Sequence, residues 1–170
     1  MRKLLFAMTG AALLAMAGTG FAQAPEQIGK SGSWSAMKFD ENGSTACYIL
    51  SEPSRKEGNY TRRGDVYVLV THRPAQNSFG IVSFTAGYDY KPNGSVEVEI
   101  DGQTFTLYTQ GNTAWAQEND DARLVDAMKI GKTMIVRGTS TRGTDTVDTY
   151  SLTGFGKALE TIDATCPRPN

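Results

Sequence analysis

The sequence predicts a mainly β protein, folded as a single-domain β-sandwich or open barrel of seven or eight mostly antiparallel strands. Three observations lead to this fold class. Short segments of alternating apolar and polar residues recur along the chain, and turn-forming residues separate them. Helical periodicity is confined to two stretches, near 121–130 and 154–164. The predicted domain extends over residues 33–166, and residues 167–170 form a tail.

The first 22 residues have the pattern of a secretion signal. Arg2 and Lys3 precede an apolar run over residues 4–17, and small residues lie before the predicted cut after Ala22. The apolar run is shorter than the about 20 residues that a transmembrane helix needs. We therefore predict a protein of the periplasm or the extracellular medium. A polar, flexible lead-in over residues 23–32 follows the cut.

The predicted strands of the first half are separated by recognisable turns. The turn at residues 40–43, Asp-Glu-Asn-Gly, predicts a hairpin between its two neighbours. Residues 52–65 are polar and charged and predict a surface loop, whereas residues 66–70 are apolar on both faces and predict a central strand. The strands expected in this half are 33–39, 45–50, 66–70 and 81–86.

The clearest local pattern is a hairpin over residues 96–109. Apolar and acidic residues alternate up to Asp101 and Gly102, which suit the positive φ angles of a type I′ turn. This turn fixes a register with one apolar face and one solvated face. The predicted cross-strand pairs are Val96–Leu107, Val98–Phe105, Glu97–Thr106 and Glu99–Thr104.

The C-terminal part predicts two strands between two helices. Asp120 and Asp121 are suited to cap the first helix, and Gly131 to end it. The second helix is expected to begin after Thr153, and Pro167 prevents its continuation. The strands are 133–137 and 146–152, and the apolar stripe of the second helix is Phe155, Ala158, Leu159 and Ile162.

The two cysteines, Cys47 and Cys166, are expected to form a disulfide because an exported protein meets an oxidising compartment. The bridge would join the C-terminal helix to a strand of the sheet. The alternative is a pair of free buried thiols. A redox role is disfavoured because the chain has no C-x-x-C motif.

The chain resembles the invasion associated locus B family of exported alphaproteobacterial proteins. The resemblance covers residues 33–166 and implies a β-rich periplasmic or secreted protein of the bacterial envelope, in a family to which no enzymatic activity is assigned. Family members close to the pathogen protein carry further cysteines in the stretch that corresponds to residues 105–116, where this chain has none. The segments that carry the resemblance are 58–67, 71–74, 82–88, 113–116 and 148–155.

Catalytic and metal sites are not indicated. His72 is the only histidine, no G-x-S-x-G motif supplies a nucleophile, and one histidine with two distant cysteines is a poor start for zinc. Asp120 and Asp121 are explained more simply as a helix cap than as calcium ligands. Glu97 and Glu99 lie side by side on a strand, which suits a solvated face better than glycoside hydrolysis. We therefore predict no catalytic residue, no metal and no cofactor.

One basic concentration is the candidate partner-binding region. A formal net charge of −1 disfavours nucleic acid as the partner. The basic residues suit a protein or an anionic envelope or host component, and the alternative is a solvated loop. The candidate residues are Tyr60, Arg62, Arg63, His72 and Arg73.

Three functional hypotheses remain at this stage: a non-catalytic binding protein, an envelope-polymer hydrolase with an acidic site, and a structural or stress-protective periplasmic protein. The sequence leaves the oligomeric state open.

Overall fold

The structure is a computed structural model that describes residues 24–117 and 120–169. The predicted secretion signal and its cleavage site lie outside the described residues. Within the described ranges the chain forms eleven strands, two α-helices and one 3-10 helix. The strands are β1 (Glu26–Ser31), β2 (Trp34–Glu41), β3 (Ser44–Ser51), β4 (Arg55–Gly58), β5 (Tyr67–Arg73), β6 (Ser78–Thr85), β7 (Ser95–Ile100), β8 (Gln103–Gln110), β9 (Thr113–Trp115), β10 (Thr133–Thr139) and β11 (Asp145–Ser151). The helices are η1 (Pro74–Gln76), α1 (Asp120–Ile130) and α2 (Phe155–Thr165).

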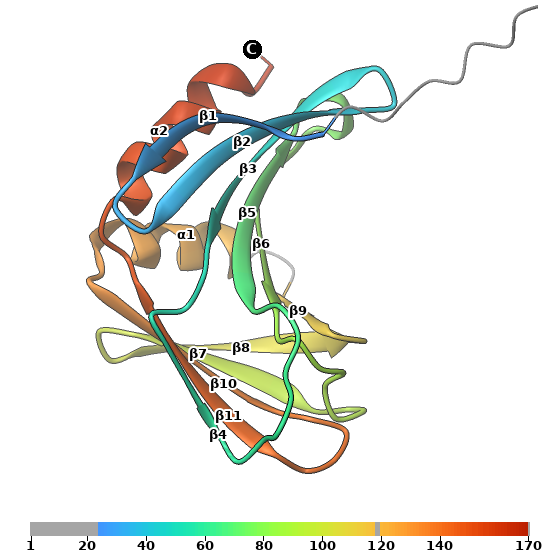
Figure 1. The fold of residues 1–170 in the computed structure, drawn as a ribbon. Coiled ribbons are helices and arrows are strands. Elements are labelled where there is room, and N and C mark those ends of the chain that lie inside the picture. The colour runs from blue at the N-terminus through green and yellow to red at the C-terminus, as the bar shows by residue number, and fades with distance from the viewer. Residues whose placement is uncertain (1–23, 118–119, 170) are drawn as a thin grey trace, which may run out of the picture.

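All strands belong to one antiparallel sheet with the order β1-β2-β3-β5-β6-β9-β8-β7-β10-β11-β4. The sheet is open, with β1 and β4 at its edges, and it bends sharply at β9 (Figure 1). We call β1, β2, β3, β5 and β6 the first arm, and β8, β7, β10, β11 and β4 the second arm. The mainly β class and the open architecture agree with the sequence prediction, and the strand count is higher than the predicted seven or eight.

Helix α1 fills the wedge where the two arms diverge. Strand β9 pairs with β6 only at Ser83–Thr85 and with β8 only at Tyr108–Gln110. Beyond these pairs the arms separate, and α1 packs against both β6 and β8. The carboxylate of Asp121 accepts a hydrogen bond from the backbone N–H of Val82 at 2.7 Å. This bond satisfies a donor on the open edge of β6, which a neighbouring strand would otherwise use.

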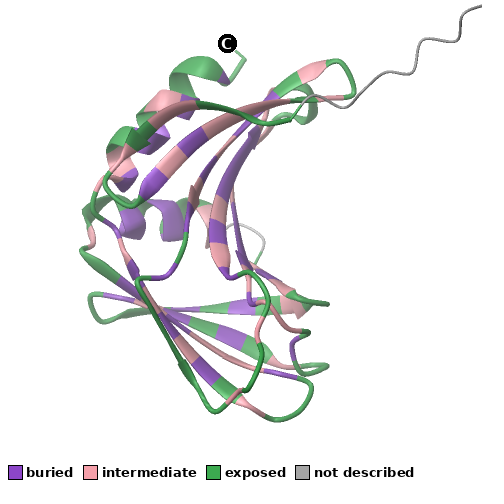
Figure 2. Cartoon of the chain, in the orientation of Figure 1, coloured by how far each residue is buried: buried purple, intermediate pink, exposed green. Residues whose placement is uncertain are grey.

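The core occupies one face of the bent sheet, which we call the inner face. Buried and more exposed residues alternate along the strands (Figure 2). Phe84 on β6 and Tyr150 on β11 meet edge to face with ring centroids 6.3 Å apart, which joins the two arms across the core. The main buried residues of the inner face are Trp34, Ala36, Cys47, Ile49, Val68, Val70, Val82, Phe84, Val96, Val98, Phe105, Leu107, Ala114, Met134, Val136 and Tyr150.

Helix α2 packs on the inner side of β1, β2 and β3. Its four predicted stripe residues are all buried, and the ring of Phe155 lies 4.9 Å from that of Trp34. The expected cap at Thr153 is wrong, because the N-cap is Gly154 with φ 91°. A side chain there would collide with the backbone of Ser31, so only glycine fits this position.

The two predicted hairpins are present. In the β7–β8 hairpin Val98 pairs with Phe105 and Glu97 with Thr106, as the alternation predicts. Asp101 and Gly102 have φ angles of 47° and 88°, the left-handed values of a type I′ turn. The β2–β3 hairpin turns in the same way at residues 42–43.

Three strands correct the sequence prediction. Residues 26–31, expected as part of a flexible lead-in, form β1 and pair with β2. Residues 55–58, expected in a surface loop, form β4 along β11. Strand β9 has three residues. The reason is common to β1 and β4. Both are edge strands without a buried residue, so their pairing in the sheet defines them and no alternating apolar pattern does.

In the described part of the chain no helix combines the length and apolar character that crossing a membrane requires.

Candidate functional site

The five candidate residues separate into two groups at opposite ends of β5. Tyr60, Arg62 and Arg63 lie in the segment that precedes β5, whereas His72 and Arg73 are its last residues. The seven residues of β5 separate the groups by about 20 Å. His72 and Arg73 also point to opposite faces of the sheet, because consecutive strand residues alternate. The structure therefore does not bring the five residues into one site.

Arg63 lies in a buried ion pair. Its guanidinium donates to both carboxylate oxygens of Asp148 at 2.7 and 2.6 Å, and its Nε donates to the carbonyl of Ala86 at 2.7 Å. The exposed fractions of the two charged side chains are 4% and 6%. Burial lowers the pKa of Arg63, but the hydrogen bonds and charge of Asp148 outweigh burial and raise it. The charge of Arg63 is therefore neutralised within the chain.

Aromatic rings surround this ion pair. The Arg63 guanidinium lies 5.4 Å from the ring centre of Tyr60 and 5.1 Å from that of Tyr88. The Tyr88 hydroxyl is 2.6 Å from the hydroxyl of Thr146 on β11. Burial raises the pKa of Tyr88 above its ordinary value. The rings and the ion pair thus form a floor without net charge for the surface above.

Glycines allow the segments around Arg63 to approach each other. The N–H of Gly64 donates to the carbonyl of Gly87 at 2.9 Å, and Gly87 has φ 72°. A Cβ atom on Gly87 would lie 2.5 Å from the Gly64 oxygen, and one on Gly138 would lie 2.7 Å from the ring of Tyr90. Larger residues at these positions would separate the segments that carry Arg63 and Tyr88.

A cleft of about 470 Å³ opens above this floor, and we call it the Arg62 cleft. It lies between the segment before β5, the segment after β6 and the β10–β11 turn. Arg62 and Arg142 are exposed on its walls, and Asp89 is an exposed carboxylate among the lining residues. Because Asp148 neutralises Arg63, the two arginines and one aspartate on the walls leave a net charge of about +1. Such a cleft suits a carboxylate or phosphate group, which arginine binds with paired N–H donors.

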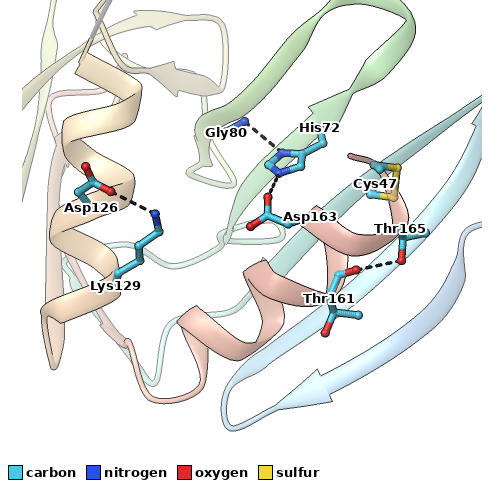
Figure 3. A network of polar contacts seen from close by, with 9 residues as sticks. Cys47, His72, Gly80, Asp126, Lys129, Thr161, Asp163 and Thr165 are labelled. Carbon is cyan, nitrogen blue, oxygen red and sulfur yellow. Dashed lines mark hydrogen bonds and ion pairs between the residues drawn. A yellow bond between two sulfur atoms is a disulfide. The ribbon is translucent and has the colours of Figure 1, made fainter. Parts of the chain in front are cut away.

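The other end of β5 has a structural network. His72 is buried and opposes a β-bulge, where Gly80 is inserted with φ 72°. The N–H of Gly80 donates to His72 Nδ1 at 3.1 Å, so His72 Nε2 carries the proton and donates to Asp163 of α2 at 2.8 Å (Figure 3). Both ring nitrogens are thereby engaged inside the protein.

The disulfide lies beside this network. Cys47 on β3 and Cys166 at the end of α2 are bonded, with their Cα atoms 6.1 Å apart (Figure 3). Cys47 is the cross-strand partner of His72. The C-terminal end of α2 is therefore attached to the first arm twice, once covalently and once through Asp163. On the outer face, Arg73 forms an ion pair with Glu41 at 3.1 Å.

Sequence reasoning missed the outer face of the first arm. The face opposite the core carries half-buried apolar and aromatic side chains on neighbouring strands, among them Tyr67 and Leu69 on β5. The signal was present, because residues 66–70 are apolar on both faces, but it was interpreted only as a central strand. The apolar surface continues from the first arm across β9 to the end of β8, and we call the whole of it the first-arm outer face. Its residues are Met37, Phe39, Tyr48, Leu50, Tyr67, Leu69, Ile81, Trp115 and Tyr108.

Metal ligation finds no support in the described ranges, where no group of three or more His, Cys, Asp or Glu residues is placed to hold an ion.

Comparison with known proteins gives one family and one solved structure. The family model "Invasion associated locus B (IalB) protein" matches residues 34–163. The crystal structure of invasion associated protein B from Bartonella henselae is similar with a TM-score of 0.55 and 18% sequence identity. The similarity covers 84% of this chain and 97% of the Bartonella chain, and it shows a shared fold. Comparison with curated proteins gave no match.

Proposed function

The chain belongs to the invasion associated locus B family, and on that premise we propose that it is an exported, non-catalytic binding protein of the bacterial envelope that engages an anionic partner at the Arg62 cleft. The secretion-signal pattern of residues 1–22 supports export to the periplasm or the medium. The Cys47–Cys166 disulfide supports an oxidising compartment.

The observation that carries the proposal is the contrast between neighbouring arginines. Arg63 is neutralised by Asp148 and fixes the floor of the cleft. Within the described residues, neither Arg62 nor Arg142 has a carboxylate at ion-pair distance. The two exposed guanidinium groups that line the cleft above the aromatic floor offer paired N–H donors to a ligand. The partner is therefore an envelope component that presents carboxylate or phosphate groups.

The placement of the ionisable residues favours binding over hydrolysis. His72 uses both ring nitrogens for Gly80 and Asp163, far from the cleft. The neighbouring carboxylates of Glu97 and Glu99, considered for an acidic hydrolase site, both accept from Arg137, at 3.3 and 2.9 Å.

The proposal is tested by cross-linking in intact cells followed by mass spectrometry. We expect one dominant envelope component attached to the wild-type protein, and its loss in the Arg62→Glu/Arg142→Glu variant. The matched control is Lys132→Glu/Lys157→Glu, which reverses two exposed charges outside the cleft and leaves the product unchanged. Equal recovery from both variants would contradict the proposal, as would a wild-type protein with no partner above background.

A further inference from the structure

The first-arm outer face is an apolar surface on a protein whose core is complete without it. Its residues lie on the neighbouring strands β2, β3, β5, β6, β9 and β8, and most are half-buried. Tyr108 is the most open of them, with 46% of its surface exposed. Both α-helices of the described residues pack on the inner face, so neither covers this one. Large contiguous apolar patches on soluble proteins mark interaction sites.

The second arm shows that the fold does not require such a surface. The outward positions of β7, β8 and β10 carry Glu97, Thr106 and Arg137, and the charged ones pair with one another. The same sheet therefore has a solvated outer face in one arm and an apolar outer face in the other. An apolar outer face beside a solvated one is typical of a surface that contacts another molecule.

We propose that the first-arm outer face is the interface of a homodimer. A charged partner gains little there, because the strand-end charges of Arg73 and Glu41 are already paired within the chain. Two copies related by a two-fold axis bring neutral, apolar sheet faces together without repulsion. Loss of water from these side chains supplies the driving force.

The dimensions of the face match those of a stable dimer. Strands β2, β3, β5 and β6, which are about 4.8 Å apart and about 25 Å long, together with the three residues of β9 cover about 500 Å² in projection. The relief of the side chains raises the accessible area toward the about 800 Å² that each partner buries in a standard interface. The face is therefore large enough to support a dimer of this chain without a further element.

The shape of the face is also self-complementary. A hollow of about 450 Å³ lies at its edge between Ile81 and Trp115, and the exposed ring of Tyr108 lies beside it. A two-fold axis between ring and hollow brings each Tyr108 to the hollow of the other copy. Such reciprocal contacts, in which residue i meets residue j and j meets i, define a two-fold interface.

The test is sedimentation equilibrium of the processed chain with its disulfide intact. We expect a dimer for the wild type, and an increase of the dimer dissociation constant by about tenfold or more for Leu69→Asp. Tyr108→Glu weakens the dimer likewise, and it keeps the fold because the side chain is half exposed. The matched control Val147→Asp alters an outward position of the second arm and leaves the dimer unchanged.

A wild-type protein that stays monomeric over the whole concentration range would overturn the proposal. The same conclusion would follow if folded Tyr108→Glu dimerised as strongly as the wild type. Circular dichroism of each variant separates loss of the dimer from loss of the fold. These outcomes do not depend on the Arg62 cleft, since none of the three substituted residues lines it.

Discussion

The two arms of the sheet share one core on the inner face, but they differ in their stabilising contacts and in the character of their outer faces. The first arm is attached to α2 by Cys47–Cys166 and by His72–Asp163, and its outer face is apolar. The second arm buries an ionisable cluster around Arg63 and Asp148, and its outer face is charged. The comparison teaches that one alternating pattern can produce two different surfaces: an apolar outer face on the first arm, and a charged outer face on the second.

The largest expected loss of stability follows from removing the disulfide of the first arm. Replacement of Cys47 and Cys166 by serine removes a link across 119 positions, which the loop-entropy model values at about 4 to 5 kcal/mol. Urea unfolding of the double variant should show a loss of this size, with the end of α2 opening first in hydrogen exchange. A loss below about 1 kcal/mol would show that packing of α2, rather than the bond, fixes this arm.

The next largest loss of stability is expected from removing one partner of the buried Arg63–Asp148 ion pair. Arg63→Met leaves Asp148 buried without a partner, which costs about 3 to 5 kcal/mol of unfolding free energy. The double variant Arg63→Met/Asp148→Leu removes both charges and should recover most of that loss. Chemical denaturation of both variants measures the difference. Equal destabilisation by the single and double variants would contradict a charge-based role for the pair.

Alkaline pH sharpens the comparison, because most tyrosines with a raised pKa lie in or beside the second arm. Burial raises the pKa of Tyr90 and Tyr150 above the ordinary 10.0. The folded protein keeps these protons at pH values where the unfolded chain releases them. These protons therefore stabilise the folded state fully below pH 10.0. As the pH rises from 10.0 through the raised folded-state pKa values, this stabilisation is lost, and the free energy of unfolding falls by about 1.4 kcal/mol per pH unit for each tyrosine.

Unfolding free energies at several alkaline pH values check this slope. Tyr90→Phe should reduce the slope, because one of the protons is no longer linked to folding. Tyrosinate absorbance provides a second readout in the folded protein. A slope that Tyr90→Phe does not change would show that other groups control the alkaline transition.

The smallest effect concerns the second attachment of α2. Asp163→Ala removes the acceptor of the His72 Nε2 proton at 2.8 Å, and 58% of the Asp163 side chain is exposed. Because water replaces the carboxylate readily, the expected loss is about 1 kcal/mol or less. Asp163→Asn keeps an acceptor oxygen and should restore most of it. Thermal unfolding that ranks asparagine no better than alanine would contradict the hydrogen bond as the cause.

Local patterns predicted a large part of this fold. The β7–β8 register followed from Asp101-Gly102 and the alternation around it, and the buried stripe of α2 followed from its spacing. Strands β1, β4 and β9 were missed because they are short or lie at an edge, so distant pairing defines them. The periodicity of apolar residues indicates which face of a strand or helix is buried. It contains little information on which distant segment packs against or pairs with that element.

The candidate site was predicted in fragments for the same reason. Tyr60, Arg62 and Arg63 are close in sequence and lie together, but Arg142 joins them only through the β10–β11 turn. His72 and Arg73 were grouped with them by charge, although they lie at the other end of β5. The neutralisation of Arg63 depends on Asp148, 85 positions away, and no local pattern indicates that pair.

The most direct test of the central claim is site-specific photo-cross-linking in intact cells. A photoreactive amino acid at Thr141, an exposed residue of the Arg62 cleft, is compared with one at Thr104, exposed on the second arm's outer face. Binding at the cleft predicts one dominant envelope component attached through Thr141 and none through Thr104. Equal labelling at both positions, or none at Thr141, would contradict the assignment of the Arg62 cleft as the binding site.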